Sequence, residues 1–121
     1  MHSLPTVKAA ASIFADGPEI ARIRQAAARA CVFVCLGFSE RNPASIGALW
    51  NSNVIVGDDG AVLAHHRKPV PTFFEKLAWN PGDGAGLQVA DTRLGRWSEG
   101  LEWGAERCPY GRDHRSLRSR Q

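Results

Sequence analysis

A cation and a carboxylate stand seven residues apart in the stretch HHRKPVPTFFEKLAWNPGDG, which runs from His65 to Gly84. Lys68 precedes a proline, which favours an extended backbone and predicts that the lysine sits at the mouth of a strand. Thr72 and Glu75 have the Thr-x-x-Glu spacing of a helix capping box, which predicts a helix beginning at Phe73. We therefore expect Lys68 and Glu75 to lie close together at a strand–helix junction, with their polar groups facing a cleft.

The segments around this pair form a longer pattern between about Gly17 and Arg96. In chain order they read GFSERN, LWNSNVIVGDDG, HRK-x-VPT-x-x-EKLAW, GDGAGL and DTRLGR. Their order and spacing resemble the nitrilase branch of the carbon-nitrogen hydrolase superfamily. The resemblance implies an α/β fold, as a partial version of that family's α-β-β-α sandwich. It also implies a small nitrile substrate, homo-oligomeric assembly and chemistry that needs no cofactor or metal.

The resemblance makes Lys68 the counterpart of the family's catalytic lysine, and Glu75 the counterpart of a glutamate that positions that lysine. In the family's chemistry a thiolate attacks a nitrile or amide carbon while a carboxylate transfers protons. A lysine aimed at the charge that develops stabilises it and also favours the thiolate. Arg67 is expected to have a structural role at the strand end. The cysteine nucleophile and the general-base glutamate have no counterpart that we can assign.

Each of these polar residues also has a structural interpretation. By residue type and location alone, Lys68 would be a solvated lysine at a strand end, and Glu75 would be explained by its part in the capping box. Both interpretations of Glu75 are compatible. His65 and His66 point to opposite faces of a strand, so they cannot bind one metal together. Gly82 to Gly84 is expected to be a turn.

Composition predicts one small domain. The chain has 121 residues, of which 44% are hydrophobic, and this is ordinary for a globular core. No apolar run approaches the roughly 20 residues of a membrane helix. The three cysteines form an odd set without metal-ligand spacing, which fits a reducing compartment. We therefore expect a cytoplasmic protein that does not enter a membrane.

The net charge of +3 comes from the end of the chain. Residues 1–105 hold equal numbers of basic and acidic residues, whereas residues 106–121 hold five arginines against Glu106 and Asp113. The basic pI therefore describes a tail and not a binding face of the domain. Dispersed arginines without interleaved aromatic residues are weak evidence for nucleic-acid binding, so we do not expect a nucleic-acid partner.

The first half of the domain is predicted as a helix followed by a buried strand. A helix is expected to start with Asp16 as its cap, and Ile20, Ile23, Ala27 and Ala30 recur at helical spacing on one face. The run CVFVCL from Cys31 to Leu36 is wholly apolar and suits a strand buried on both faces. Cys31 and Cys35 share a face about 13 Å apart, too far for a disulfide, and are expected in the core. Residues 39–43 are predicted as a loop.

The second half is predicted as a hairpin and a short strand. Two β-prone runs, at 49–56 and 61–66, are joined across Gly57, Asp58, Asp59 and Gly60, which predicts a β-hairpin. The second run delivers His65, His66, Arg67 and Lys68 to its end. A further strand is expected at 87–90, with a turn at 91–93.

The ends of the chain depart from the family's pattern. We divide the chain into a divergent segment at 1–15, a partial carbon-nitrogen hydrolase domain at 16–96, and a non-matching, Arg-rich tail at 97–121. Without gaps, Glu102 occupies the place of the nucleophilic cysteine, and a buried strand cannot hold such a charge. Cys108 lies in a polar context, and we do not assign it as the nucleophile. We hypothesise that the coding sequence shifts frame near Arg96.

Two functions from different classes are consistent with the sequence. The first is a fragment of a nitrilase-type hydrolase, whose complete form converts a nitrile or cyanide to an acid or amide plus ammonia. Such a fragment would be inactive as it stands, because loss of a nucleophile costs on the order of a millionfold in rate. The alternative is a non-enzymatic interaction module whose arginine tail binds acidic partners or nucleic acid. A thiol hydrolase using Cys108 and His114 is a poorer third hypothesis.

Overall fold

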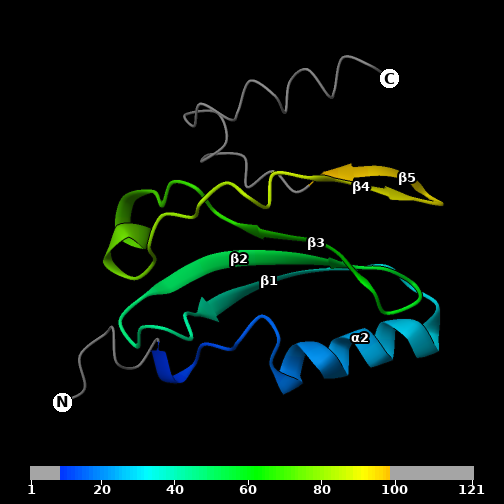
Figure 1. Ribbon diagram of the computed structural model, residues 1–121, viewed down its shortest axis with the longest axis horizontal. Coiled ribbons are helices and arrows are strands. Elements are labelled where there is room, and N and C mark those ends of the chain that lie inside the picture. The colour runs from blue at the N-terminus through cyan, green and yellow to red at the C-terminus, as the bar shows by residue number, and fades with distance from the viewer. Residues whose placement is uncertain (1–8, 99–121) are drawn as a thin grey trace.

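The computed structural model describes residues 9–98 as one helix and two small sheets. The elements are α2 (Pro18–Ala30), β1 (Val34–Arg41), β2 (Leu49–Val56), β3 (Val62–Arg67), the 3-10 helix η1 (Phe73–Leu77), β4 (Val89–Thr92) and β5 (Gly95–Ser98). Strands β1, β2 and β3 form an antiparallel sheet in that order, and β4 pairs with β5. Helix α2 covers one face of the larger sheet, and the β4–β5 hairpin lies on the other side (Figure 1).

Helix α2 begins at Pro18, one residue later than it would begin with Asp16 as its N-cap. Its N-cap is Gly17, which makes no side-chain capping bond, and Pro18 is the first helical residue. The Gly17 N–H donates to the Phe14 carbonyl, so a turn precedes the helix and Asp16 lies outside it. The prediction of Asp16 as the cap is therefore wrong. The predicted apolar face is confirmed at Ile20 and Ala27, which are buried against the sheet, whereas Ile23 is half-buried and Ala30 is exposed.

Strand β1 differs most from its prediction. It starts at Val34 and continues through residues 39–41, which were expected in a loop. Its side chains alternate between more and less exposed positions, so the prediction of a strand buried on both faces is wrong. The physical reason is its place at the outside of the sheet: among the described residues it pairs with β2 on one side and with Ile13 alone on the other.

The two cysteines of this region are exposed and not in the core. Cys31 is not in the strand at all, because it ends α2 in the left-handed conformation with φ 53°. Its N–H donates to the Ala28 carbonyl, which closes the last turn of the helix. Cys35 lies in β1 with its side chain exposed. An apolar run was taken for a buried strand, but the helix end occupies the first part of that run.

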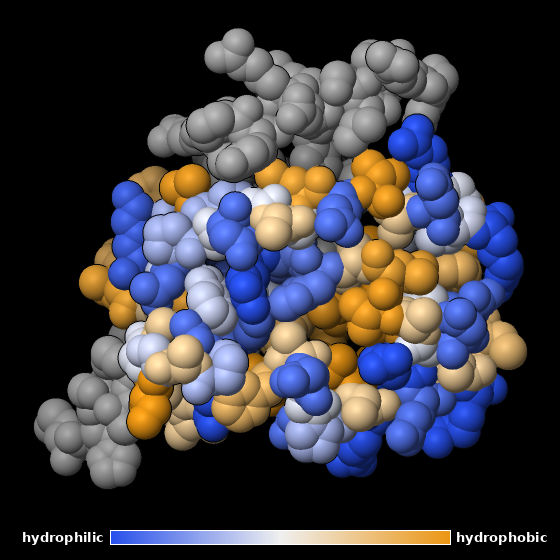
Figure 2. Space-filling model, viewed as in Figure 1, coloured by the Kyte–Doolittle hydropathy of each residue, from blue (hydrophilic) through white to orange (hydrophobic). Residues whose placement is uncertain are grey.

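The predicted hairpin is confirmed. Strands β2 and β3 are antiparallel and are joined across residues 57–61, and an irregularity in the pairing lies between Ile55 and Val56. Successive residues of β2 enter two separate apolar clusters: Val54 and Val56 pack with α2, whereas Ile55 packs with Ala64 and Ala90 on the opposite face. Figure 2 shows apolar side chains gathered over this end of the sheet, between α2 and the β4–β5 hairpin.

The segment between η1 and β4 runs tightly along the outer side of β3. The Gly82 N–H donates to the Lys68 carbonyl at 3.0 Å. A Cβ atom at Gly86 would lie 2.1 Å from the His65 carbonyl oxygen, a distance that no side chain tolerates. The turn expected at residues 82–84 lies two residues later, because the Leu87 N–H donates to the carbonyl of Gly84, which has φ 76°. These glycines therefore let the backbone cover the strand that ends at the lysine.

The end of the described chain forms a second hairpin. Strand β4 spans Val89–Thr92, two residues later than predicted, and the turn lies at Arg93 and Leu94. Strand β5 was not predicted. It places Trp97 beside Phe33, with the ring centroids 5.7 Å apart. Within residues 9–98 no helix has the length and apolarity needed to span a membrane.

The close approach at Gly86 makes a testable prediction about stability. Gly86→Ala should lower the free energy of unfolding by about 2 kcal/mol or more, because the new methyl group forces the segment away from β3. Gly47→Ala is the matched control, since nothing lies within 4 Å of a Cβ at that position. Urea unfolding followed by tryptophan fluorescence would measure both. Equal stability of the two variants would contradict the described packing.

Candidate functional site

Lys68 is enclosed and does not lie in solvent. Its residue is 7% exposed. The Lys68 N–H donates to the Asn51 carbonyl at 2.8 Å and its own carbonyl accepts from Gly82, so the backbone continues the pairing of β3 by one residue. The Nζ atom lies 2.6 Å from Oε2 of Glu75 and 3.3 Å from Oγ1 of Thr72. The expected strand-mouth position and the expected proximity to Glu75 are both present.

Glu75 is held by the start of η1. Its Oε2 accepts the Thr72 N–H at 2.7 Å and the Thr72 hydroxyl at 2.9 Å, and Oε1 lies 3.4 Å from the Asn51 amide nitrogen. The capping box and the helix start at Phe73 are confirmed, although the helix is a five-residue 3-10 segment. Phe73 has φ 47°, a conformation that costs energy in a residue other than glycine. The cap holds the backbone there.

The ion pair changes the acidity of Glu75. Partial burial alone would raise its pKa, but the bonds from Lys68 and from the Thr72 backbone and hydroxyl outweigh burial and lower the pKa to about 2. Glu75 is therefore a carboxylate throughout the physiological pH range, and it keeps a negative charge against the ammonium of Lys68. A lysine held in this way is a fixed positive charge that can face a developing anion.

A second carboxylate, that of Glu40, is buried beside the end of β3. Glu40 is 1% exposed and accepts hydrogen bonds from the Ser52 hydroxyl at 2.5 Å and from Nη2 of Arg67 at 2.6 Å. Nε2 of His65 lies 2.8 Å from it. Burial raises its pKa, but the bonds from His65, Arg67 and Ser52 outweigh burial and lower the pKa to about 2. Glu40 lies in a strand and not in the expected loop, and the cluster is not predicted from the sequence.

A strand-period signal could have found Glu40. Val34, Leu36 and Phe38 alternate along β1 and pack against the helix-side core. Continuing that period by one step puts Glu40 on the same face. An acid in a buried register position requires a partner, and Arg67 is the basic residue at the corresponding end of β3.

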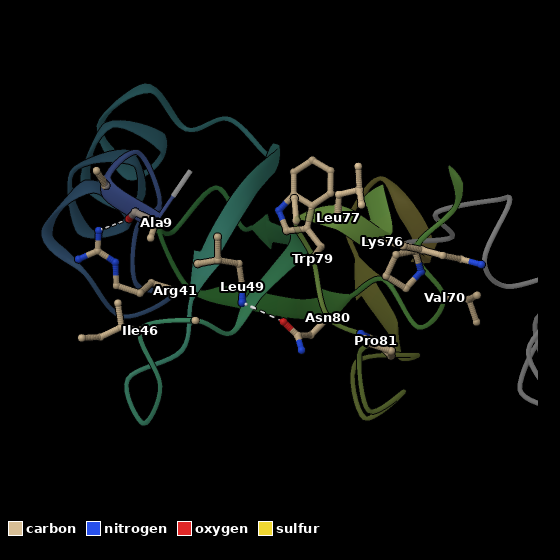
Figure 3. Close-up of a pocket in the computed structure, with 14 residues that line it drawn as sticks. Ala9, Arg41, Ile46, Leu49, Val70, Lys76, Leu77, Trp79, Asn80 and Pro81 are labelled. Atoms are coloured by element: carbon tan, nitrogen blue, oxygen red, sulfur yellow. Dashed lines mark hydrogen bonds between the residues drawn. The ribbon is translucent and has the colours of Figure 1, made fainter. Parts of the chain in front are cut away.

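An apolar pocket of about 890 Å³ is lined by the neighbours of the pair, Val70, Pro71 and Lys76, whereas Lys68 and Glu75 themselves do not line it. Its wall at Leu49 is two residues along β2 from Asn51, which contacts Glu75. Arg41 and Ile46 lie on one side of the pocket, and Leu77, Trp79 and Pro81 lie on the other (Figure 3). Asn80 links the two sides, because its backbone and side chain bond with Leu49. The same short helix therefore carries Glu75 and part of the pocket wall.

The predictions for the two histidines can be compared with the structure, whereas most of those for the C-terminal tail cannot. His65 contacts Glu40, whereas His66 is completely buried on the opposite face of β3, as the strand period predicts. Among residues 9–98 no three His, Cys, Asp or Glu side chains are grouped so that they could hold a metal. Glu102, Cys108 and His114 lie outside the described residues, as does most of the tail assigned to 97–121.

Comparison with known proteins decides the family. The family model described as carbon-nitrogen hydrolase matches residues 3–112. The chain belongs to the carbon-nitrogen hydrolase family. A cyanide hydratase from Gibberella zeae is 45% identical over 101 residues, which cover 79% of this chain and 27% of that protein. A bromoxynil-specific nitrilase from Klebsiella pneumoniae subsp. ozaenae is 41% identical over 85 residues, which cover 70% and 24%.

The fold of this family member agrees with a solved relative. The crystal structure of a carbon-nitrogen hydrolase from Helicobacter pylori G27 matches with a TM-score of 0.56 and 26% identity, over 64% of this chain and 26% of that one. The α/β architecture and the partial sandwich are therefore confirmed. The chain spans about a quarter of the length of the relatives it matches.

The Lys68–Glu75 ion pair makes a testable prediction about pH dependence. Because the pKa of Glu75 is lowered from 4.5 to about 2, its contribution to stability is complete above pH 4.5 and is lost as the pH falls towards 2. The shift corresponds to about 3 kcal/mol, which solvent screening at this partly exposed carboxylate reduces to about 2 kcal/mol. In Lys68→Met the pKa of Glu75 should rise, because only the two Thr72 bonds remain to lower it, and the acid-dependent loss should shrink by part of that amount. Urea unfolding at several pH values between 5 and 2 would measure it.

Lys76→Met is the matched control for this experiment. Lys76 lies on the same short helix with an exposed side chain, so its removal should leave the acid-dependent loss of stability intact. If Lys68→Met and Lys76→Met retained the same pH dependence, the ion pair would not exist in solution as described.

Proposed function

We propose that this chain carries the lysine–glutamate half of a nitrilase-type active site, in which Lys68 is catalytic and Glu75 positions it. The observation that carries the proposal is the enclosed Lys68 ammonium, 2.6 Å from a carboxylate that stays charged. The complete enzyme would convert a small nitrile or cyanide to an acid or amide plus ammonia. Family membership and the names of the relatives support that substrate class.

The proposed chemistry assigns each group one role. A thiolate adds to the electrophilic carbon of the nitrile, and negative charge develops on the nitrogen. The Lys68 ammonium faces that charge and stabilises it. Glu75 fixes the direction of the ammonium, because its lowered pKa leaves it ionised at neutral pH. The apolar pocket beside the pair supports this proposal, since it offers room for the organic part of a nitrile.

The proposal includes low or absent activity for this chain by itself. Neither a nucleophilic cysteine nor a general-base glutamate has been assigned, and a group of residues that acts as a unit loses most of its rate when one member is missing. The interaction-module alternative depends on residues 106–121, which lie outside the described part of the chain. Salt-sensitive binding of nucleic acid that disappears on deletion of these residues would favour that alternative.

A chimera tests the proposed role of Lys68. Residues 16–96 would replace the matching segment of the Gibberella zeae cyanide hydratase, and ammonia or formamide release from cyanide would be measured. The chimera should be active, and Lys68→Ala should lower its rate by at least about 100-fold, because it removes the donor that faces the developing charge. Arg22→Ala, at an exposed position of helix α2 outside the pocket lining, is the control and should keep the rate.

Two results would contradict the proposal. A folded chimera in which Lys68→Ala works at the parent rate would remove the lysine from the chemistry. The unmodified 121-residue chain should release ammonia from cyanide or benzonitrile no faster than its Lys68→Ala variant does. Turnover of the unmodified chain that this substitution abolishes would show instead that the chain is complete enough to react.

The proposal extends to a cytoplasmic protein that self-associates. Exposed apolar side chains on η1 support self-association, because Phe73, Phe74 and Leu77 are 86%, 84% and 65% exposed, and an exposed apolar patch is typical of a protein–protein contact. Sedimentation velocity should therefore detect a dimer or larger species. Phe74→Glu should reduce that species, because it places a charge on this exposed apolar surface. A monomer at all concentrations would contradict the prediction.

A further inference from the structure

The buried Glu40 cluster has no role in the chemistry proposed above. It joins three strands: Glu40 comes from β1, Ser52 from β2, and His65 and Arg67 from β3. The carboxylate group is almost wholly removed from solvent. Burial of an ionised carboxylate is costly unless several donors compensate it. Here three side chains do so, and they converge on one end of the sheet.

Arg67 is fixed on two sides by this cluster. Its Nη2 atom lies 2.6 Å from Oε1 of Glu40, and its Nε atom lies 3.1 and 3.2 Å from the two carboxylate oxygens. The centre of its guanidinium lies 4.0 Å from the Trp50 ring centroid. A forked contact to a carboxylate together with stacking on an aromatic ring defines the orientation of an arginine far better than a single ion pair does.

Arg67 and Lys68 are consecutive residues, and this determines the faces of the sheet to which their side chains point. Successive residues of an extended strand point to opposite faces of a sheet. Lys68 is still in extended pairing, since its N–H donates to Asn51 and its carbonyl accepts from Gly82. Locking Arg67 on the helix-covered face therefore fixes the direction of Lys68 on the other face, where Thr72 and Glu75 receive the ammonium.

We propose that Glu40 is a positioning residue for Lys68, and that it acts through Arg67 across the thickness of the sheet. The inference deepens the proposed function, because it names a residue that the Lys68 site requires on the opposite face. Glu40 touches no reacting atom. It fixes the strand end, and the fixed strand end aims the ammonium at Glu75 and at the charge that develops on the substrate.

The structure supplies a matched control for Glu40. Asp83 is the other carboxylate near Arg67, but its Oδ2 lies 3.7 Å from Nη1 and its side chain is 59% exposed. An exposed, long contact of this kind contributes little to orientation. Glu40→Gln and Asp83→Asn remove the same charge near the same arginine, so only the buried, forked contact differs between them.

The test measures the Lys68–Glu75 pair in the full 121-residue chain, without turnover. Carboxyl-carbon NMR would follow the titration of Glu75, and nitrogen NMR would follow the Lys68 ammonium. Glu40→Gln should raise the pKa of Glu75 by roughly one unit, because a loosened lysine stabilises the carboxylate less. Asp83→Asn should not raise it. The direction is informative, since removing a distant negative charge by itself would lower that pKa.

Two outcomes overturn the inference. One is a folded Glu40→Gln chain in which Glu75 titrates and the Lys68 ammonium resonates as in the unsubstituted protein. The other is an equal rise of the Glu75 pKa in Asp83→Asn. If Glu40→Gln does not fold, Arg67→Lys decides the question, because it keeps a cation for Glu40 and loses the fork and the stacking. It should raise the pKa of Glu75, and an unchanged value would overturn the inference.

These readouts separate this inference from the proposed function. A chimera that needs Lys68 for its rate, combined with an unmoved Glu75 pKa in Glu40→Gln, would keep the function and discard the positioning role. A shifted pKa in a chimera that does not need Lys68 would keep the positioning role and discard the chemistry.

Discussion

One carboxylate oxygen holds the candidate site together. Oε2 of Glu75 receives the Lys68 ammonium, the Thr72 N–H and the Thr72 hydroxyl, all within 2.9 Å. The same contacts that begin the short helix therefore hold the lysine. They also stabilise the left-handed backbone of Phe73, a conformation that is unfavourable for a residue other than glycine. Local structure and a functional charge depend on a single interaction, so a change that removes it affects both.

The strand end that presents the lysine is fixed from every side by a different part of the chain. Strand β2 pairs with it through Asn51, and the glycine segment covers its outer edge through Gly82. The cluster around Glu40 anchors the helix-covered face, and η1 closes the other face. Most of these contacts join residues that are far apart in the sequence. Together they hold the Lys68 ammonium in one direction, whereas an unsupported lysine side chain would be mobile. A fixed charge requires no rearrangement when a reaction begins, which is the physical basis of its use in catalysis.

Local sequence signals predicted the elements next to the lysine well. The capping box at Thr72 and Glu75 depends on four consecutive residues, and the hairpin depends on a turn flanked by apolar runs, so neighbouring residues contain the information. The predictions that failed depend on distant partners. Cys35 looked like a core residue because the sequence does not reveal that β1 lies at the outside of the sheet, whereas Cys31 belongs to the end of α2 and not to the strand. Glu40 looked like a loop residue because its compensating arginine is 27 positions away.

The central claim is that Lys68 is an enclosed, ion-paired ammonium, unlike an ordinary surface lysine. Reductive methylation of the native chain, followed by peptide mass spectrometry, tests this most directly because reaction requires an accessible, deprotonated amine. Our account predicts that Lys68 is modified far more slowly than Lys76, which is exposed on the same short helix, and that Glu75→Gln removes much of this protection. Equal rates at Lys68 and Lys76 in the native protein would contradict the account.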